Sequence, residues 1–224
     1  MNSIQNIRHE DVLRYLGYRG QEIAEDLLAE VRAGESKMLS VANPKSVFCV
    51  FDRIDTETGI ALAGTTLVLK GDDIKAHLAG CTKVALLAAT LSADTDRAIT
   101  AAGVESMTKS LILDAAADAL IEQVCDHVES EIHAYMPRMH ATWRFSPGYG
   151  DFPIAQQNEI LTVLNAQKRI GLCATDSCLL TPRKSVTAVI GLAEQELPKK
   201  QKGCESCTMR ETCAFRKRGE RCVW

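Results

Sequence analysis

The chain has 224 residues, 46% of them hydrophobic and 25% charged, and a formal net charge of −3. This size allows one large domain with or without a small appendage, and no apolar run reaches the roughly 18 residues that cross a bilayer. The acidic balance and the aromatic content of 5% argue against a general nucleic-acid-binding protein. The polar N-terminus lacks an apolar signal core, so we expect a cytoplasmic protein with no membrane partner.

The first third of the chain predicts helix and then a pair of strands. Residues 8–33 carry apolar side chains at helical spacing, with an interruption near Gly17 and Gly20. Residues 46–54 (SVFCVFDRI) and 61–69 (ALAGTTLVL) are rich in β-branched and aromatic residues and flank a TETG turn. This pattern is typical of two paired strands.

The next segments predict a short helix, a buried strand and another helix. The helix at 72–80 begins at Asp72 or Asp73, either of which can cap it. Residues 83–91 (KVALLAATL) form an almost continuous apolar run, as expected for a strand buried on both faces. Residues 92–102 begin with a serine cap and continue as helix.

Residues 108–136 predict the longest helix, and Pro137 ends it. Apolar residues recur on one face at every third or fourth position: Leu113, Ala117, Leu120, Val124, Val128, Ile132 and Tyr135. Acidic residues recur at spacing four: Asp114, Asp118, Glu122 and Asp126. By pattern alone, such a stripe is a solvated acidic face.

Residues 153–171 predict a second amphipathic helix that ends at Gly171. Residues 179–193 (LLTPRKSVTAVIGLA) follow as a turn and a strand, and residues 194–203 form a linker. Helices and strands mix without a βαβ rhythm, which favours an α+β fold.

The segment 198–224 is a basic tail with four cysteines. It holds eight Lys or Arg and three Glu, a net charge of +5, so the rest of the chain carries −8. The candidate metal ligands are Cys204, Cys207, Cys213 and Cys222. Their spacing suits zinc or an iron–sulfur cluster. An unstructured tail with reduced thiols is the alternative. The five other cysteines are expected to be small buried hydrophobes.

Residues 144–149 read RFSPGY, a cation in front of a rigid Pro-Gly turn. This segment resembles the R-x-x-P-G-Y motif of the activation (reactivation) domain of cobalamin-dependent methionine synthase. Three further segments are similar to stand-alone or full-length members in the same order: 89–99 (ATLSADTDRAI), 113–126 (LDAAADALIEQVCD) and 175–192 (TDSCLLTPRKSVTAVIGL). The resemblance covers residues 80–195 well and the N-terminal part loosely. It implies a twisted, mainly antiparallel sheet with long flanking helices in an activation-domain-like domain of residues 1–197.

The resemblance implies a site for S-adenosylmethionine (AdoMet). Its residues would be Glu122, Arg144, Ser146, Pro147, Gly148 and Tyr149. The guanidinium fork of Arg144 would bind the ligand carboxylate, and Glu122 would pair with the amine, with Asp114 as the alternative. The Pro147-Gly148 corner would let the backbone approach the ligand, Ser146 would contribute backbone contacts, and Tyr149 would close the pocket. An Arg144 turned instead to a carboxylate of the protein itself would contradict this hypothesis.

The resemblance also implies the chemistry. The family presents AdoMet to cob(II)alamin, an electron arrives from a donor such as flavodoxin or ferredoxin, and the methyl group restores methylcobalamin. No corrinoid, folate or homocysteine module is recognisable here. The chain would therefore act in trans on a corrinoid protein or a methionine synthase that lacks its own activation domain, and that partner would supply the cobalamin.

Two departures and two alternatives stay open. A family tyrosine beyond the last matched strand has no counterpart, and the cysteine tail takes its place, as an electron-entry cluster or a docking clip. No catalytic side chain is expected, because cobalt makes the nucleophilic attack. The main alternative is a non-enzymatic corrinoid-protein adaptor with a metal-stapled tail. An ordinary methyltransferase is a weaker hypothesis, because no strand leads into a glycine-rich turn.

Overall fold

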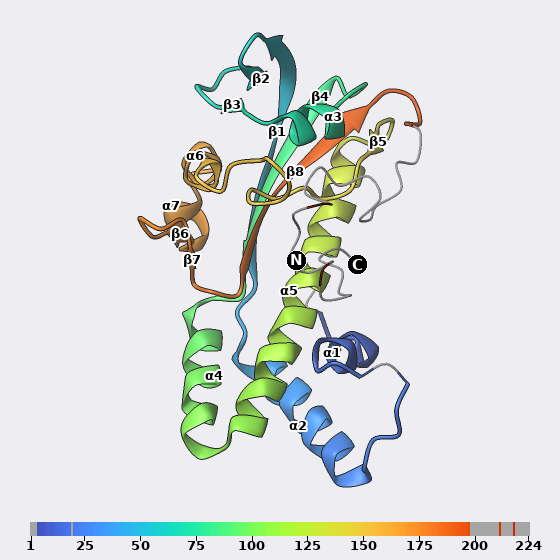
Figure 1. Ribbon diagram of the computed structural model, residues 1–224, viewed down its shortest axis with the longest axis vertical. Helices are drawn as coiled ribbons and strands as arrows, with labels where there is room; N and C mark the ends of the chain where they lie inside the picture. The colour runs from blue at the N-terminus through green and yellow to red at the C-terminus, as the bar shows by residue number, and fades with distance from the viewer. Residues whose placement is uncertain (1–3, 19, 198–210, 212–216, 218–224) are drawn as a thin grey trace.

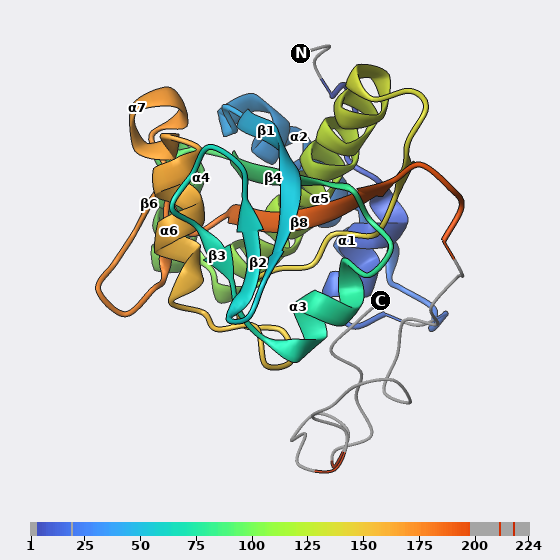
Figure 2. The ribbon, with the colours of Figure 1, turned by 90° about the horizontal axis from the view of Figure 1, so that it is seen from above.

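The computed structural model describes residues 4–18, 20–197, 211 and 217. Its centre is a six-stranded sheet with the strand order β3-β2-β1-β4-β8-β5, and every paired strand in it is antiparallel. Helices cover both faces of this sheet (Figures 1 and 2). The structure thus confirms the expected α+β class and the antiparallel sheet.

The sheet is built around three long or central strands. They are β1 (Lys45–Thr56), β4 (Lys83–Thr90) and β8 (Ser185–Ala193). Shorter strands extend its two edges: β2 (Gly59–Leu62), β3 (Val68–Leu69) and β5 (His140–Ala141). The predicted strand at 46–54 lies within β1, but the single strand expected at 61–69 is instead two short strands, because β2 ends at Leu62 and β3 turns back to pair with it.

Four helices lie on one face of the sheet. They are α1 (His9–Tyr15), α2 (Glu25–Val41), α4 (Ala93–Glu105) and α5 (Met107–Tyr135). α5 is the long diagonal helix of Figure 1, with α1 and α2 beside it. The predicted interruption at Gly17 and Gly20 separates α1 from α2, and both glycines have positive φ.

The opposite face carries shorter elements: α3 (Asp72–His77), α6 (Gln156–Val163), α7 (Ala166–Ile170), β6 (Cys173–Ala174) and β7 (Leu180–Thr181). The single helix expected at 153–171 is therefore two helices. Asn165 adopts a left-handed conformation between them, which ends α6, while Gly171 ends α7 as predicted.

β4 divides the two hydrophobic cores. Its side chains alternate between the faces: Ala85, Leu87 and Ala89 face the α5 side, and Val84, Leu86 and Ala88 face the α6 side. All six are buried. A strand covered on both faces has no polar alternation, which is why residues 83–91 read as a continuous apolar run.

Three expectations about individual residues need correction. Ser92 precedes α4, but its side chain makes no capping hydrogen bond. The amides at the start of α3 are bound by Asp151 rather than capped by Asp72 or Asp73. The apolar stripe of α5 is buried except at Tyr135, which is 66% exposed near the end of the helix. The replacement of the α3 cap by Asp151 is a tertiary contact that local spacing does not encode.

Among the described residues, no helix combines the length and the apolar content needed to cross a membrane.

The contact between α2 and α5 yields a stability test at Gly34. A Cβ at this position would lie 2.4 Å from Cγ2 of Ile112, a branched side chain that is 3% exposed. We expect Gly34→Ala to lower the free energy of unfolding by about 1–3 kcal/mol through overpacking, despite the better helix propensity of alanine.

Gly103 in α4 is the matched control for this test. The nearest atom to its Cβ position is Oγ of Ser110 at 3.4 Å, so Gly103→Ala fits and is expected to raise the free energy of unfolding by up to about 1 kcal/mol. Urea unfolding of both variants measures the difference. Equal shifts for the two variants would contradict the tight α2–α5 contact.

Candidate functional site

The backbone around Arg144 is fixed along strand β8. Thr142 N donates to Gly191 O at 2.8 Å, and Phe145 and Val189 exchange two hydrogen bonds of 2.9 and 2.8 Å. Arg144 lies between these attachments. Its side chain therefore leaves a constrained backbone and reaches the face of the sheet that α5 covers.

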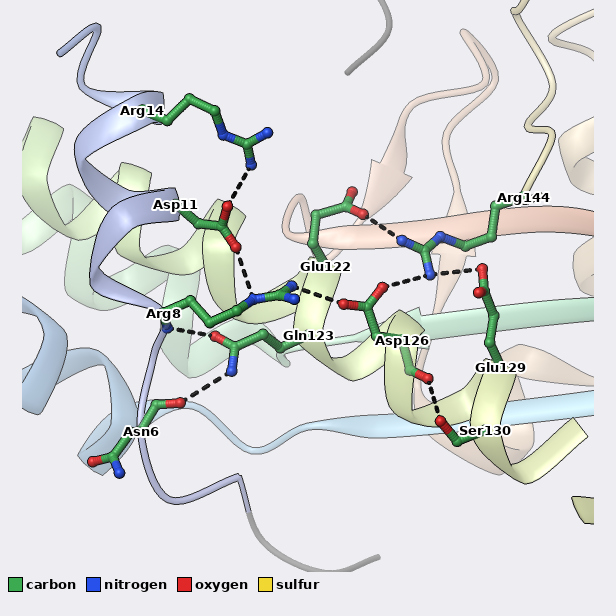
Figure 3. A network of polar contacts seen from close by, with 10 residues as sticks. All are labelled: Asn6, Arg8, Asp11, Arg14, Glu122, Gln123, Asp126, Glu129, Ser130 and Arg144. Atoms are coloured by element: carbon green, nitrogen blue, oxygen red, sulfur yellow. Dashed lines mark hydrogen bonds and ion pairs between the residues drawn. The ribbon is translucent and has the colours of Figure 1, made fainter. Parts of the chain in front are cut away.

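The Arg144 guanidinium contacts three carboxylates of α5 (Figure 3). Its Nη2 is 2.8 Å from Glu122 Oε2, and its Nη1 is 3.0 Å from Asp126 Oδ1 and 2.8 Å from Glu129 Oε1. Positions four and seven residues after Glu122 fall on the same face of a helix. Three acidic residues from successive turns of α5 therefore bind the same guanidinium.

The guanidinium is more buried than its partners. The Arg144 side chain is 20% exposed, whereas the three carboxylates are 38–43% exposed. Burial disfavours the charged guanidinium, but the surrounding acidic groups, including Glu129 and Glu122, outweigh burial and raise its pKa above the ordinary value. The cation is permanent, and its acidic partners form the solvent-facing rim of the site.

Three of the five N–H donors of the guanidinium bind these carboxylates. Within the described residues, the Arg144 Nε–H and one N–H of Nη2 make no hydrogen bond. These two donors and the three partly exposed carboxylates are the polar groups that the cluster presents.

The N-terminal segment completes the network. Arg8 Nη2 is 2.7 Å from Asp126 Oδ2, and Arg8 Nε is 2.7 Å from Asp11 Oδ2. Gln123 accepts from Arg8 N at 2.8 Å and donates to Asn6 O at 3.0 Å. Sequence reasoning missed these contacts, because nothing in the local pattern near residue 8 indicates α5 as a neighbour.

Tyr15 of α1 lies in the same electrostatic environment. Burial, followed by the negative charge of Glu122, raises its pKa to about 12. Its phenol stays protonated at neutral pH and adds a neutral polar group beside the acids.

A second cation neutralises the earlier part of the acidic stripe. Lys184 Nζ is 2.9 Å from Asp114 Oδ1 and 2.7 Å from Asp118 Oδ1, and its side chain is 10% exposed. Burial raises the pKa of Asp118 although the Lys184 charge opposes the shift. The expected solvated acidic face is therefore wrong, since all four of its acids bind cations.

The structure also separates the two candidates for the acidic ligand contact. Glu122 forms an ion pair with Arg144. Asp114 lies about two helical turns before Glu122, about 12 Å along the helix axis, and binds Lys184 instead. Glu129 was missed, although its spacing from Glu122 puts it on the same helix face and could have revealed it.

The Pro-Gly segment forms a compact turn after Arg144. Tyr149 N donates to Ser146 O at 3.2 Å, and Gly148, with φ of 93°, donates to Phe152 O at 2.8 Å. Tyr149 is 48% exposed, and its ring meets that of Phe145 edge-on at 6.2 Å between centroids. Pro147 directly precedes this positive-φ glycine, as expected for a Pro-Gly turn.

The predicted metal ligands lie outside the described residues. Within residues 4–18, 20–197, 211 and 217, no group of three or more His, Cys, Asp or Glu could hold a metal ion. Of the five described cysteines, Cys81 and Cys125 are buried as expected and burial raises the pKa of Cys125, whereas three are only partly buried: Cys49, Cys173 and Cys178.

Among solved structures, the chain is similar to the MetH reactivation domain in a crystal structure with AdoHcy bound. The TM-score is 0.64 at 15% sequence identity, and the match covers 95% of this chain and 83% of that one. No protein-family model and no curated protein sequence matches. The likeness shows that the chain has the reactivation-domain fold, and it extends the resemblance to the N-terminal part that sequence covered only loosely.

Lys184 yields a pH-dependent stability test. Lys184→Met leaves Asp114 and Asp118 without their cation, and we expect the free energy of unfolding at pH 7 to fall by about 1–3 kcal/mol, since both carboxylates are more than one third exposed. The folded-state pKa of Asp118 lies above its ordinary 3.8, so the charged form opposes folding. The deficit should shrink as pH falls through the folded-state pKa towards 3.8.

The control for this test is Lys109→Met, which removes an exposed ion pair with Glu105. We expect a change below about 0.5 kcal/mol at either pH. Unfolding in urea at pH 7 and pH 4 measures both variants. A Lys184→Met deficit that grows on acidification would contradict the assignment of the carboxylates as its source.

Proposed function

We propose that this protein binds AdoMet at Arg144 and supports reductive methylation of a cobalamin held by a separate corrinoid protein. The proposal is supported by the proximity of Arg144 and Glu122, which the sequence resemblance assigns to the ligand's carboxylate and amine: their side chains are 2.8 Å apart, near enough for both to reach one ligand after their mutual ion pair opens. They come from segments 22 residues apart. The likeness of the fold to a reactivation domain crystallised with AdoHcy supports the same ligand class.

The charges of the cluster are complementary to AdoMet. Arg144 with Glu122, Asp126 and Glu129 carries −2, and Arg8 brings the group to −1. AdoMet has one carboxylate and two cationic groups, an ammonium and a sulfonium. In the proposed complex the ligand carboxylate takes the remaining donors of Arg144, and Glu122 turns to the ammonium. Charge-assisted bonds of this kind are the strong ones.

The proposed reaction follows from that placement. One electron from a donor protein such as flavodoxin or ferredoxin reduces cob(II)alamin on the partner. The reduced cobalt attacks the methyl carbon of AdoMet, a Co–C bond forms, the S–C bond breaks, and the thioether AdoHcy leaves. The attack needs no base from this protein, so its contribution is to hold and orient the methyl donor. We place this reaction in the cytoplasm.

One observation favours the alternative, an adaptor without AdoMet chemistry. Arg144 is held by carboxylates of the protein itself, which is the arrangement that sequence analysis named as contradicting a ligand role. In that case the cluster ties the α5 helix to the edge of the sheet, and the chain acts by holding a corrinoid protein.

We further propose that residues 198–224 bind a metal through Cys204, Cys207, Cys213 and Cys222 and that they contact the partner or admit the electron. Eight basic residues around four thiolates support an anionic cluster. Metal analysis of anaerobically purified protein separates the two versions. Iron with sulfide supports electron entry, whereas one zinc without a chromophore supports docking.

Arg144 variants test the AdoMet proposal by calorimetry. We expect Arg144→Ala to weaken AdoMet binding at least about 100-fold, since a charged ligand group loses its fork. Arg144→Lys keeps the charge but not the fork and should weaken binding about tenfold or more. Glu122→Gln, which loses only the partner of the amine, should have a smaller effect than Arg144→Ala.

Arg53 provides the matched control. Its side chain is also largely buried, at 17% exposure, but it binds Cys81 O and Asp55 instead of the α5 acids. Arg53→Ala should leave AdoMet affinity within about twofold, a difference below 0.5 kcal/mol. If the wild-type protein has no measurable AdoMet affinity, the proposal is contradicted and the adaptor alternative is favoured.

A further inference from the structure

Two aspartates tie the loop 146–152 to the start of α3. Asp151 Oδ2 accepts from Asp72 N at 2.6 Å, and Asp151 Oδ1 accepts from Asp73 N at 2.9 Å. In return, Asp73 Oδ2 accepts from Asp151 N at 3.1 Å. Each aspartate thus binds the backbone of the other across 78 residues of chain (Figure 2 shows the loop before α6 passing α3).

Where the loop 146–152 contacts the start of α3, two positions have room only for glycine. A Cβ at Gly150 would lie 1.9 Å from Asp73 Oδ2, and a Cβ at Gly71 would lie 2.8 Å from Asp151 Oδ1. Both residues have positive φ, of 55° and 122°. The close approach of the two backbones is therefore specified by the sequence on both sides.

The loop 146–152 is also anchored through Phe152. Phe152, which is 1% exposed, stacks with Phe145 at 6.1 Å between ring centroids. Its backbone accepts from Gly148 N and donates to Tyr149 O. Phe145 is bonded to Val189 of β8. The Pro-Gly-Tyr turn thus lies between an anchor on β8 and the aspartate pair on α3.

We infer that Asp73 and Asp151 are positioning residues for the proposed AdoMet site. This assignment rests on the proposed function. The aspartate pair orders the turn that carries Tyr149 before a ligand arrives, so binding does not have to order it. Neither aspartate is among the residues that the family motif contains, and neither touches Arg144 in the described network.

Calorimetry with AdoMet tests this role. We expect Asp151→Ala and Asp73→Ala to weaken binding about tenfold, the effect of a loop that must be ordered on binding. Asp73→Asn keeps an oxygen acceptor for Asp151 N and should restore affinity to within about twofold. Amide hydrogen exchange at Gly148 and Phe152 should accelerate in the two alanine variants and stay slow in Asp73→Asn.

The control is Ser106→Ala, which removes a weaker side-chain bond to a helix amide, that of Lys109 N at 3.4 Å at the start of α5. A general loss of stability would act alike in Ser106→Ala and the aspartate variants, whereas the inference predicts affinity and exchange changes only in the latter. If Asp151→Ala does not fold, the Asp73→Ala and Asp73→Asn pair carries the test.

The outcomes separate this inference from the proposed function. AdoMet binding by wild type, with equal affinities for Asp73→Ala, Asp151→Ala and Ser106→Ala, overturns the positioning role and leaves the proposed function standing. No AdoMet binding by wild type overturns the proposed function, and the positioning role with it. Weak binding by Asp73→Ala that Asp73→Asn restores supports both.

Discussion

The contact between the Arg144 guanidinium and the acidic stripe of α5 is the interaction on which the site depends. Like charges at spacing four along a helix repel, and they persist on a half-buried face only where cations balance them. Arg144 and Lys184 supply that balance, one at each end of the stripe. Three carboxylates against the one guanidinium of Arg144 leave a net negative charge, which is the basis of the proposal that the cluster receives a ligand with positive groups.

The fold explains why the two groups meet. β4 is covered on both faces, so α5 must pack across the strands, and β8 beside it fixes the chain that carries Arg144. The bonds between Phe145 and Val189 set the direction in which Arg144 leaves the sheet edge. A site formed by a rigid helix and a chain bonded to a central strand holds its geometry better than one on free loops.

Most of the elements could be predicted from sequence because their signals are local. The apolar run at 83–91, the long periodic helix and the breaks at Gly17 and Gly171 all appear where spacing and turn chemistry put them. The cations that neutralise the α5 acids could not be predicted, because Lys184 and Arg8 approach through tertiary structure. The split of the helix at Asn165 was missed because one left-handed residue leaves the apolar periodicity intact. Of the site, Arg144 and Glu122 came from the family resemblance, and no residue pattern alone would have joined them.

Binding of AdoMet as proposed requires Arg144 to exchange carboxylates of its own protein for that of AdoMet. A crystal structure of the protein grown with AdoMet tests it most directly. We expect the ligand carboxylate on Arg144, with Glu122 rotated from the guanidinium to the ligand ammonium and Tyr149 over the ligand. AdoMet bound elsewhere, with the Arg144 contacts to Glu122, Asp126 and Glu129 unchanged, would contradict it.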